Sequence, residues 1–226
     1  MIKLSRDIGT DLGTANVLVY LDGKGIVINE PSAVALDKNT GKVLQVGAAA
    51  KKMLGRTPGN IVAARPLEHG AISDYDMTAT MLSVYLRRIT KMSLVKPRVV
   101  VSVPSGITEV EERAVIQAAM EAGARRVYLI EEPLAAAIGA GMDIKGAGGS
   151  MVIDIGGGTT DIAVLSLNNV VRSTSIDAAG DAFDNAIIQY IRERYQVLVG
   201  NQTAEEIKMA IGCVNPRPEA LVMTVK

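Results

Sequence analysis

One turn-and-strand pattern occurs twice in this chain and constrains its fold more than any other feature. Residues 6–20 read as a strand, an aspartate, an apolar residue, a glycine, a small polar turn and a second strand. Residues 151–165 repeat that order. Each copy is followed by a second turn signal, Asp22-Gly23 or Asn168-Asn169, and then by another strand. Two copies of one β-meander predict two structurally similar halves.

Strand-like and helix-like segments alternate between these copies. Apolar runs rich in β-branched residues predict buried strands at 99–103, 127–130 and 151–153. An exposed strand is expected at 220–225. Helical periodicity occurs at 77–89 and at about 181–195. The alternation of strands and helices predicts an α/β fold.

Three further helices are predicted from their first turns. Thr108-x-x-Glu111 and Thr203-x-x-Glu206 have the spacing of a capping box, in which two side chains satisfy free backbone amides. Pro133 is suited to the first position of a helix because its fixed φ is already helical.

Composition excludes several classes of function. Lys plus Arg and Asp plus Glu both number 24, and aromatic residues make up 3%. These values argue against a basic or base-stacking nucleic-acid binder, so no nucleic-acid partner is expected. The single cysteine, Cys213, excludes an intrachain disulfide or a cysteine-cluster metal site. His69, the single histidine, is interpreted as an ordinary polar residue.

The start of the sequence, like its cysteine content, predicts a cytoplasmic location. Met1 is followed by a short charged stretch that does not resemble a signal peptide. No run of about 18 apolar residues predicts a membrane span. A single cysteine is typical of a reducing compartment.

The repeated turns have the chemistry of a phosphate site. Glycines after the strand let backbone N–H groups converge on an anion, and threonine hydroxyls add donors. Two facing turns would hold a polyphosphate from both sides. Asp11 and Asp154 would then oppose each other and attract Mg²⁺ mainly through its waters, with Asp161 joining the water shell. The alternative is a pair of plain glycine hairpins, which a single copy would favour; neither copy is a P-loop.

Longer stretches resemble a known family. Asp11-Leu12-Gly13-Thr14 and residues 154–161 resemble the two phosphate motifs of the actin, Hsp70 and sugar-kinase superfamily. Within it, six stretches resemble the MreB family of bacterial actin homologues: residues 11–16, 29–32, 53–59, 103–106, 122–126 and 131–141. The similarity extends from about residue 6 to about residue 212.

The resemblance implies an actin-like, ribonuclease H-like α/β fold with a duplicated β-meander. Residues 1–145 would form the first domain, with a small insert at about 30–75, and residues 146–226 an incomplete second domain. We expect the chain to be a fragment of a longer open reading frame. As such, it would bind nucleotide poorly and would not polymerise normally.

The resemblance also implies the site residues. Glu132 would position or activate the water that attacks the γ-phosphate of ATP, assisted by Thr159. Without the resemblance, Glu132 is better interpreted as a first-turn acid on a helix dipole, and Glu205 and Lys208 as a solvated helical face. The residues implied to contact nucleotide are Gly13, Thr14, Ala15, Asn16, Gly156, Gly157, Gly158, Thr159, Thr160, Gly180, Glu205, Glu206, Ile207 and Lys208.

Family resemblance implies a slow ATPase in the complete protein, assembled into paired protofilaments at the inner face of the cytoplasmic membrane. These filaments would organise the cell-wall elongation machinery and maintain rod shape. Met92, Leu94 and Val95, between two lysines, would contact the bilayer, although packing under the domain is the alternative. The rival functions are an Hsp70-type chaperone ATPase and a small-molecule kinase of the same superfamily.

Overall fold

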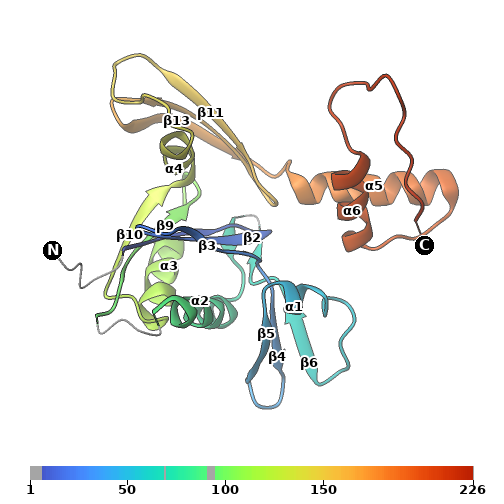
Figure 1. The fold of residues 1–226 in the computed structure, drawn as a ribbon, viewed down its shortest axis with the longest axis horizontal. Coiled ribbons are helices and arrows are strands. Elements are labelled where there is room, and N and C mark those ends of the chain that lie inside the picture. The colour runs from blue at the N-terminus through green and yellow to red at the C-terminus, as the bar shows by residue number, and fades with distance from the viewer. Residues whose placement is uncertain (1–6, 69, 91–94, 226) are drawn as a thin grey trace.

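The computed structural model describes residues 7–68, 70–90 and 95–225 (Figure 1). A five-stranded sheet in the order β10-β9-β1-β2-β3 lies at its centre. β1 pairs antiparallel with β2 and parallel with β9, and β9 pairs parallel with β10. The strands of this sheet are β1 (Asp7–Leu12), β2 (Asn16–Leu21), β3 (Gly25–Pro31), β9 (Arg98–Val103) and β10 (Arg126–Glu131).

Two helices, α2 (Tyr75–Thr90) and α3 (Glu109–Glu121), cover one face of this sheet (Figure 1). The largest core lies between these helices and the sheet, and it includes the fully buried Val101, Met81 and Tyr85. The capping box predicted at Thr108 is confirmed, because the Thr108 side chain accepts from the Glu111 backbone while the Glu111 side chain accepts from Thr108 N–H.

The second β-meander forms a separate three-stranded antiparallel sheet in the order β11-β12-β13. It repeats the β1-β2-β3 arrangement, so the prediction of a duplicated meander is confirmed. A short helix, α4, packs against it and begins directly after β10. Pro133 is its second residue, one position later than predicted but still in the first turn. The elements are β11 (Ser150–Ile155), β12 (Thr160–Ser166), β13 (Asn169–Ile176) and α4 (Glu132–Gly139).

The prediction that 151–153 is buried throughout is wrong for one face of β11. Val152 is 9% exposed and packs in a small core with Ala137 and Leu165, whereas Met151 and Ile153 are 59% and 57% exposed. The reason is that α4 packs on one face of this sheet only. Period-2 alternation, rather than a run of apolar residues, therefore describes this strand.

A small sheet in the order β5-β4-β6 and the short helix α1 together form what we call the small sheet unit, residues 33–64. Its core consists of Ala33, Ala35 and Ala50. A two-stranded ribbon, β7-β8, leads from this unit to α2. The elements are β4 (Val34–Asp37), β5 (Val43–Val46), α1 (Ala48–Lys51), β6 (Ile61–Ala64), β7 (Leu67–Glu68) and β8 (Ala71–Ile72).

The last two helices, α5 (Gly180–Tyr195) and α6 (Asn201–Ile211), pack on each other and are called the helix pair below (Figure 1). The capping box predicted at Thr203 is wrong: α6 begins earlier, after Gly200, which supplies no side-chain cap. The strand expected at 220–225 is also wrong, because 221–225 have no regular structure and pair with no strand in the part of the chain that is described.

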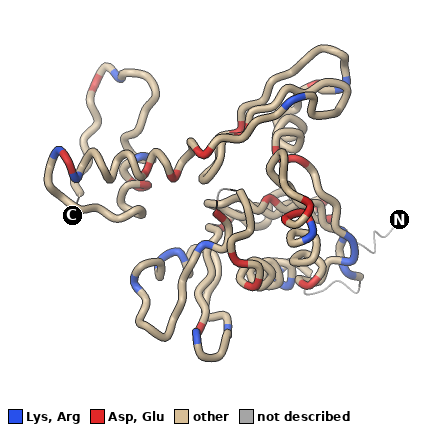
Figure 2. Tube along the Cα trace, turned by 180° about the vertical axis from the view of Figure 1, so that it is seen from behind, with Lys and Arg blue, Asp and Glu red and all other residues tan. Residues whose placement is uncertain are grey.

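Basic and acidic residues both occur in every part of the described fold, and neither sign occupies one part alone (Figure 2). Among these residues, no helix is long and apolar enough to cross a membrane.

Candidate functional site

The turn after β1 is tightly closed and is held from behind. A Cβ added to Gly13 would lie 2.8 Å from the Asn16 carbonyl oxygen, so the turn leaves no space for a side chain there. Ser32 holds the turn twice: its hydroxyl donates to the Gly13 carbonyl, and its N–H donates to the Ala15 carbonyl at 2.9 Å. The buried Thr14 hydroxyl accepts from Gly70 N–H at 2.9 Å. We call residues 13–16 the first turn.

The equivalent turn after β11, residues 156–159, is called the second turn. It closes through Gly156 N–H, which donates to the Thr159 carbonyl at 2.9 Å. The first residues of α5 support it, because Gly180 N–H donates to the Gly156 carbonyl at 3.1 Å and Asp181 N–H donates to the Gly157 carbonyl at 2.8 Å. Helix α5 is therefore attached to the second turn by its backbone.

The two turns lie directly against each other. A Cβ added to Gly157 would stand 2.5 Å from Ala15 Cβ and 3.2 Å from Ala15 N. Gly158, Thr159 and Thr160 complete the second turn and the start of β12; the Thr160 hydroxyl donates to the Ala178 carbonyl at 2.6 Å. The structure therefore brings together the two segments that the sequence analysis paired.

Four carboxylates gather beside the turns. Asp11 is at the end of β1, Asp154 and Asp161 are register partners in the β11-β12 ladder, and Glu132 is at the start of α4. Burial is the main cause that raises the pKa of Glu132 to about 8, and the charges of Asp11, Asp161 and Asp154 raise it further. Burial likewise raises the pKa of Asp11 and of Asp154 above their ordinary values. Mutual repulsion adds to both shifts, which places these groups in one electrostatic cluster.

Hydrogen bonds leave part of this cluster free for a ligand. Ser102 Oγ donates to Asp11 Oδ1 at 2.8 Å, and Thr159 Oγ1 donates to Asp161 Oδ2 at 3.2 Å. Asp161 Oδ1 is buried and has no hydrogen-bond partner among the described atoms. Within the described residues, no three acidic, histidine or cysteine side chains come close enough to hold a metal ion by themselves.

The helix pair carries the remaining predicted site residues. Lys208 Nζ donates to the Gly180 carbonyl at 3.0 Å and pairs with Asp184 at 2.9 Å. Ile207 is 8% exposed and packs inward, while Glu206 is exposed and accepts a hydrogen bond from Gln202. Of the residues predicted on α6, Lys208 is therefore connected to the second turn through Gly180.

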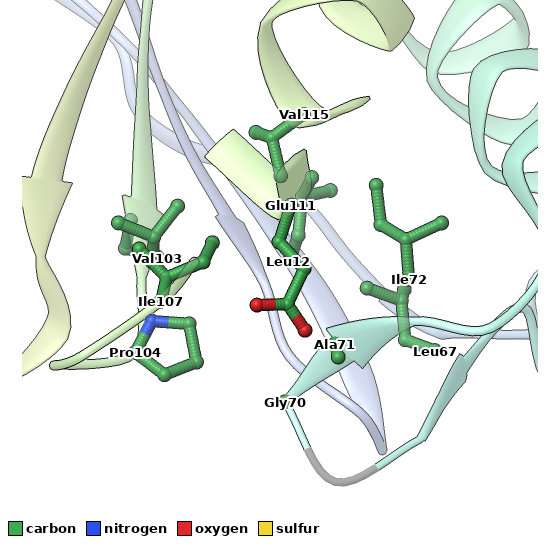
Figure 3. Close-up of a pocket in the computed structure, with 11 residues that line it drawn as sticks. Leu12, Leu67, Gly70, Ala71, Ile72, Val103, Pro104, Ile107, Glu111 and Val115 are labelled. Atoms are coloured by element: carbon green, nitrogen blue, oxygen red, sulfur yellow. The ribbon is translucent and has the colours of Figure 1, made fainter. Parts of the chain in front are cut away.

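A cavity of about 10 Å³ lies behind the first turn (Figure 3). Much of its apolar lining comes from Leu12, Leu67, Val103 and Ile107. In Figure 3 the carboxylate of Glu111 lies beside Ala71. A space of this size holds about one water molecule. It separates β1 from the segment around Gly70 and is too small for a nucleotide.

Sequence reasoning missed several partners of the site. Ser102 and the ion pairs Lys51–Glu205 and Arg65–Asp181 carried no local signal. The two ion pairs join positions separated by 154 and 116 residues. Only the folded chain brings such partners together.

The three residues predicted to contact the membrane, Met92, Leu94 and Val95, lie between α2 and β9 in the sequence. Met92 and Leu94 lie outside the described residues, as does His69. Val95 is described and is partly buried.

Paired meanders, facing turns and a shared acidic cluster define an actin-like protein. The crystal structure of MreB5 of Spiroplasma citri bound to ADP has this fold: the TM-score is 0.88 at 41% identity, over 95% of this chain and 64% of that one. The same protein bound to AMPPNP gives a TM-score of 0.88. The MamK double helical filament, at 21% identity and a TM-score of 0.81, shares the fold.

The chain belongs to the MreB/Mbl family, whose model, described as MreB/Mbl protein, matches residues 5–226. The cell shape-determining protein Mbl of Bacillus subtilis is 55% identical over 213 residues, covering 94% of this chain. The cell shape-determining protein MreB of Escherichia coli K12 is 51% identical over 228 residues, covering 98%. The chain spans 64% and 66% of the lengths of these two relatives. These matches favour the cell-shape family over the chaperone and kinase alternatives.

Proposed function

We propose that the complete protein binds ATP between the first and second turns and hydrolyses it slowly. The observation that carries the proposal is the contact between Gly157 and Ala15, with four carboxylates beside it. Backbone N–H groups of the two turns would hold the phosphate chain. MreB5 of Spiroplasma citri, which has the same fold, was solved with ADP and with AMPPNP.

We further propose that Mg²⁺ accompanies the nucleotide, held through water by Asp11, Asp154 and Asp161. Their mutual repulsion and the unpartnered Asp161 Oδ1 support this assignment. When bound, the cation neutralises charge on the phosphates. Removing it with a chelator should lower the affinity for ATP, and restoring Mg²⁺ should recover it.

Glu132 is proposed to accept the proton of the attacking water, with Thr159 assisting. Burial and three neighbouring carboxylates raise the pKa of Glu132 to about 8, so the group accepts a proton readily once it is ionised. A cation bound beside those carboxylates would favour the ionised form. Thr159 shares a hydrogen bond with Asp161, which would fix its hydroxyl near the same water.

Measuring the rate of ATP hydrolysis and the affinity for AMPPNP separates proton acceptance by Glu132 from binding of the phosphates. Glu132→Gln should slow ATP hydrolysis by about 10² or more while AMPPNP binds within a few-fold of the unchanged protein. Equal hydrolysis rates in the two proteins would exclude Glu132 as the proton acceptor. Saturable binding of AMPPNP and absence of binding by AMP would support the phosphate site itself.

On the nucleoside side, Glu205 and Lys208 are proposed to contact ribose and adenine. Both lie on the face of α6 that is partly buried, and Lys208 already reaches Gly180 at the second turn. Glu206 and Ile207 lie between them in the sequence.

The family assignment supports assembly into membrane-associated filaments that organise cell-wall synthesis and maintain rod shape. Sedimentation after addition of ATP tests self-assembly. Met92→Ser with Leu94→Ser should abolish binding to anionic liposomes if this segment inserts. Unchanged liposome binding would contradict the membrane part alone. Phosphorylation of a sugar or acetate by the protein would instead support the kinase alternative.

A further inference from the structure

Two ion pairs connect the small sheet unit and the segment after it to the helix pair. Lys51 Nζ, at the end of α1, donates to Glu205 Oε2 on α6. Arg65 Nη1, directly after β6, donates to Asp181 Oδ1 at 3.0 Å and to Oδ2 at 3.2 Å. In Figure 2, basic residues of the small sheet unit and acidic residues of the helix pair occupy these neighbouring segments.

On the helix pair, both acidic partners are joined to the second turn. Asp181 donates its own N–H to the Gly157 carbonyl. Glu205 lies one turn before Lys208, which donates to the Gly180 carbonyl. A displacement of either carboxylate would therefore be transmitted to the second turn.

On the other side, Arg65 is joined to the first turn. It precedes Pro66, whose carbonyl accepts from Ser73 N–H at 3.0 Å and closes the loop that contains Gly70. Gly70 N–H in turn donates to Thr14 Oγ1. Asp181 is thus hydrogen-bonded to the second turn, and Arg65 is connected to the first turn through the chain that leads to the Gly70–Thr14 hydrogen bond.

We propose that Lys51 and Arg65 are positioning residues that clasp the small sheet unit to the helix pair. The clasp holds the second turn against the first, and Lys51 orients Glu205 by occupying one of its two oxygens. The clasp itself rests on the two ion pairs, whereas its effect on nucleotide selectivity rests on the proposed function.

The clasp is suited to reversible closure. Side-chain exposures are 27% and 24% for Lys51 and Glu205, and 28% and 38% for Arg65 and Asp181. Ion pairs that remain partly in water are weak and are screened by salt. Two such pairs acting together would favour the closed arrangement without locking it.

Distance measurements test the clasp without any nucleotide. Spin labels at Asn39→Cys on the β4-β5 hairpin and Glu193→Cys on α5, both exposed, report the separation in a Cys213→Ser background. Lys51→Glu combined with Arg65→Glu should lengthen and broaden the distance distribution. Raising the salt concentration should do the same to the unchanged protein.

Two further variants make the result specific. Lys51→Glu with Glu205→Lys reverses the pair and should restore the short distance lost in Lys51→Glu. Lys52→Glu changes the same charge one position along, at a residue with no ion pair among the described contacts, and should leave the distance unchanged. Identical distributions in all variants would overturn the clasp.

A selectivity measurement tests the positioning of Glu205. The ratio of affinities for ATP and for 2′-deoxy-ATP or 3′-deoxy-ATP should fall at least threefold in Lys51→Met, because Glu205 loses its fixed orientation. If Lys51 had a purely structural role, its loss would lower the affinity for all three nucleotides equally and leave the ratio unchanged. That result would overturn the claim that Lys51 orients Glu205. Failure of the unchanged protein to bind any of them would instead reject the proposed function, and the distance measurement would still decide the clasp.

Discussion

Gly157 lies so close to Ala15 that a Cβ added to it would stand 2.5 Å from Ala15 Cβ. The residues belong to the two copies of the meander, so this contact fixes the separation of the first and second turns. A methyl group at Gly157 would have to push the turns apart, since the neighbouring atoms include the backbone of Ala15.

Gly157→Ala should therefore weaken AMPPNP binding by about tenfold or more, equivalent to about 1.4 kcal/mol. It should also lower the free energy of unfolding by about 1–3 kcal/mol through overpacking. Gly148→Ala is the matched control, because a Cβ there meets no atom within 4 Å. Titration calorimetry and urea unfolding measure the two effects; equal behaviour of both variants would contradict the close contact.

Glu132 should make stability depend on pH. Its pKa is raised from 4.5 to about 8 in the folded chain, so the folded state holds the proton more tightly than the unfolded state. The stability that protonated Glu132 provides is complete below about pH 4.5. It is lost as the pH rises towards 8, with a limiting slope of about 1.4 kcal/mol per pH unit for one proton.

Glu132→Gln should remove that slope. The variant should be more stable than the unchanged chain at pH 8, by at least about 1 kcal/mol, and the difference should shrink towards pH 5. Urea unfolding across this range measures it. Glu131→Gln, the neighbouring carboxylate that accepts a hydrogen bond from Ser105, serves as control. Parallel pH profiles for the unchanged chain and Glu132→Gln would contradict the raised pKa.

Local signals predicted the repeated meander, the phosphate-type turns and the elements with strong caps, because each depends on residues close in sequence. Thr108 and Thr203 show the limit of such signals: both precede a glutamate by three positions, but only Thr108 caps a helix. Packing of the helix pair places the start of α6 at Asn201, which makes Thr203 an internal residue. The Lys51–Glu205 pair and the exposed face of β11 depend on tertiary structure, which no local pattern contains.

The two threonines can be compared directly. Thr108→Ala should lower the free energy of unfolding by about 1 kcal/mol, because an N-cap hydrogen bond and its reciprocal partner are lost. Thr203→Ala should change it by less than about 0.5 kcal/mol. Thermal and urea unfolding measure both, and a loss of equal size in Thr203→Ala would mean that the box forms at Thr203 after all.

The two faces of β11 should respond in opposite ways to the same charge. Met151 is 59% exposed, so Met151→Lys should change the free energy of unfolding by less than about 0.5 kcal/mol and should reduce binding of a hydrophobic dye. Val152 is 9% exposed beneath α4, so Val152→Lys buries a charge that has no partner there. It should cost at least about 3 kcal/mol or prevent the β11-β13 sheet from packing. Urea unfolding and dye fluorescence measure the pair; a large loss of stability in Met151→Lys would show that its face of the sheet is covered.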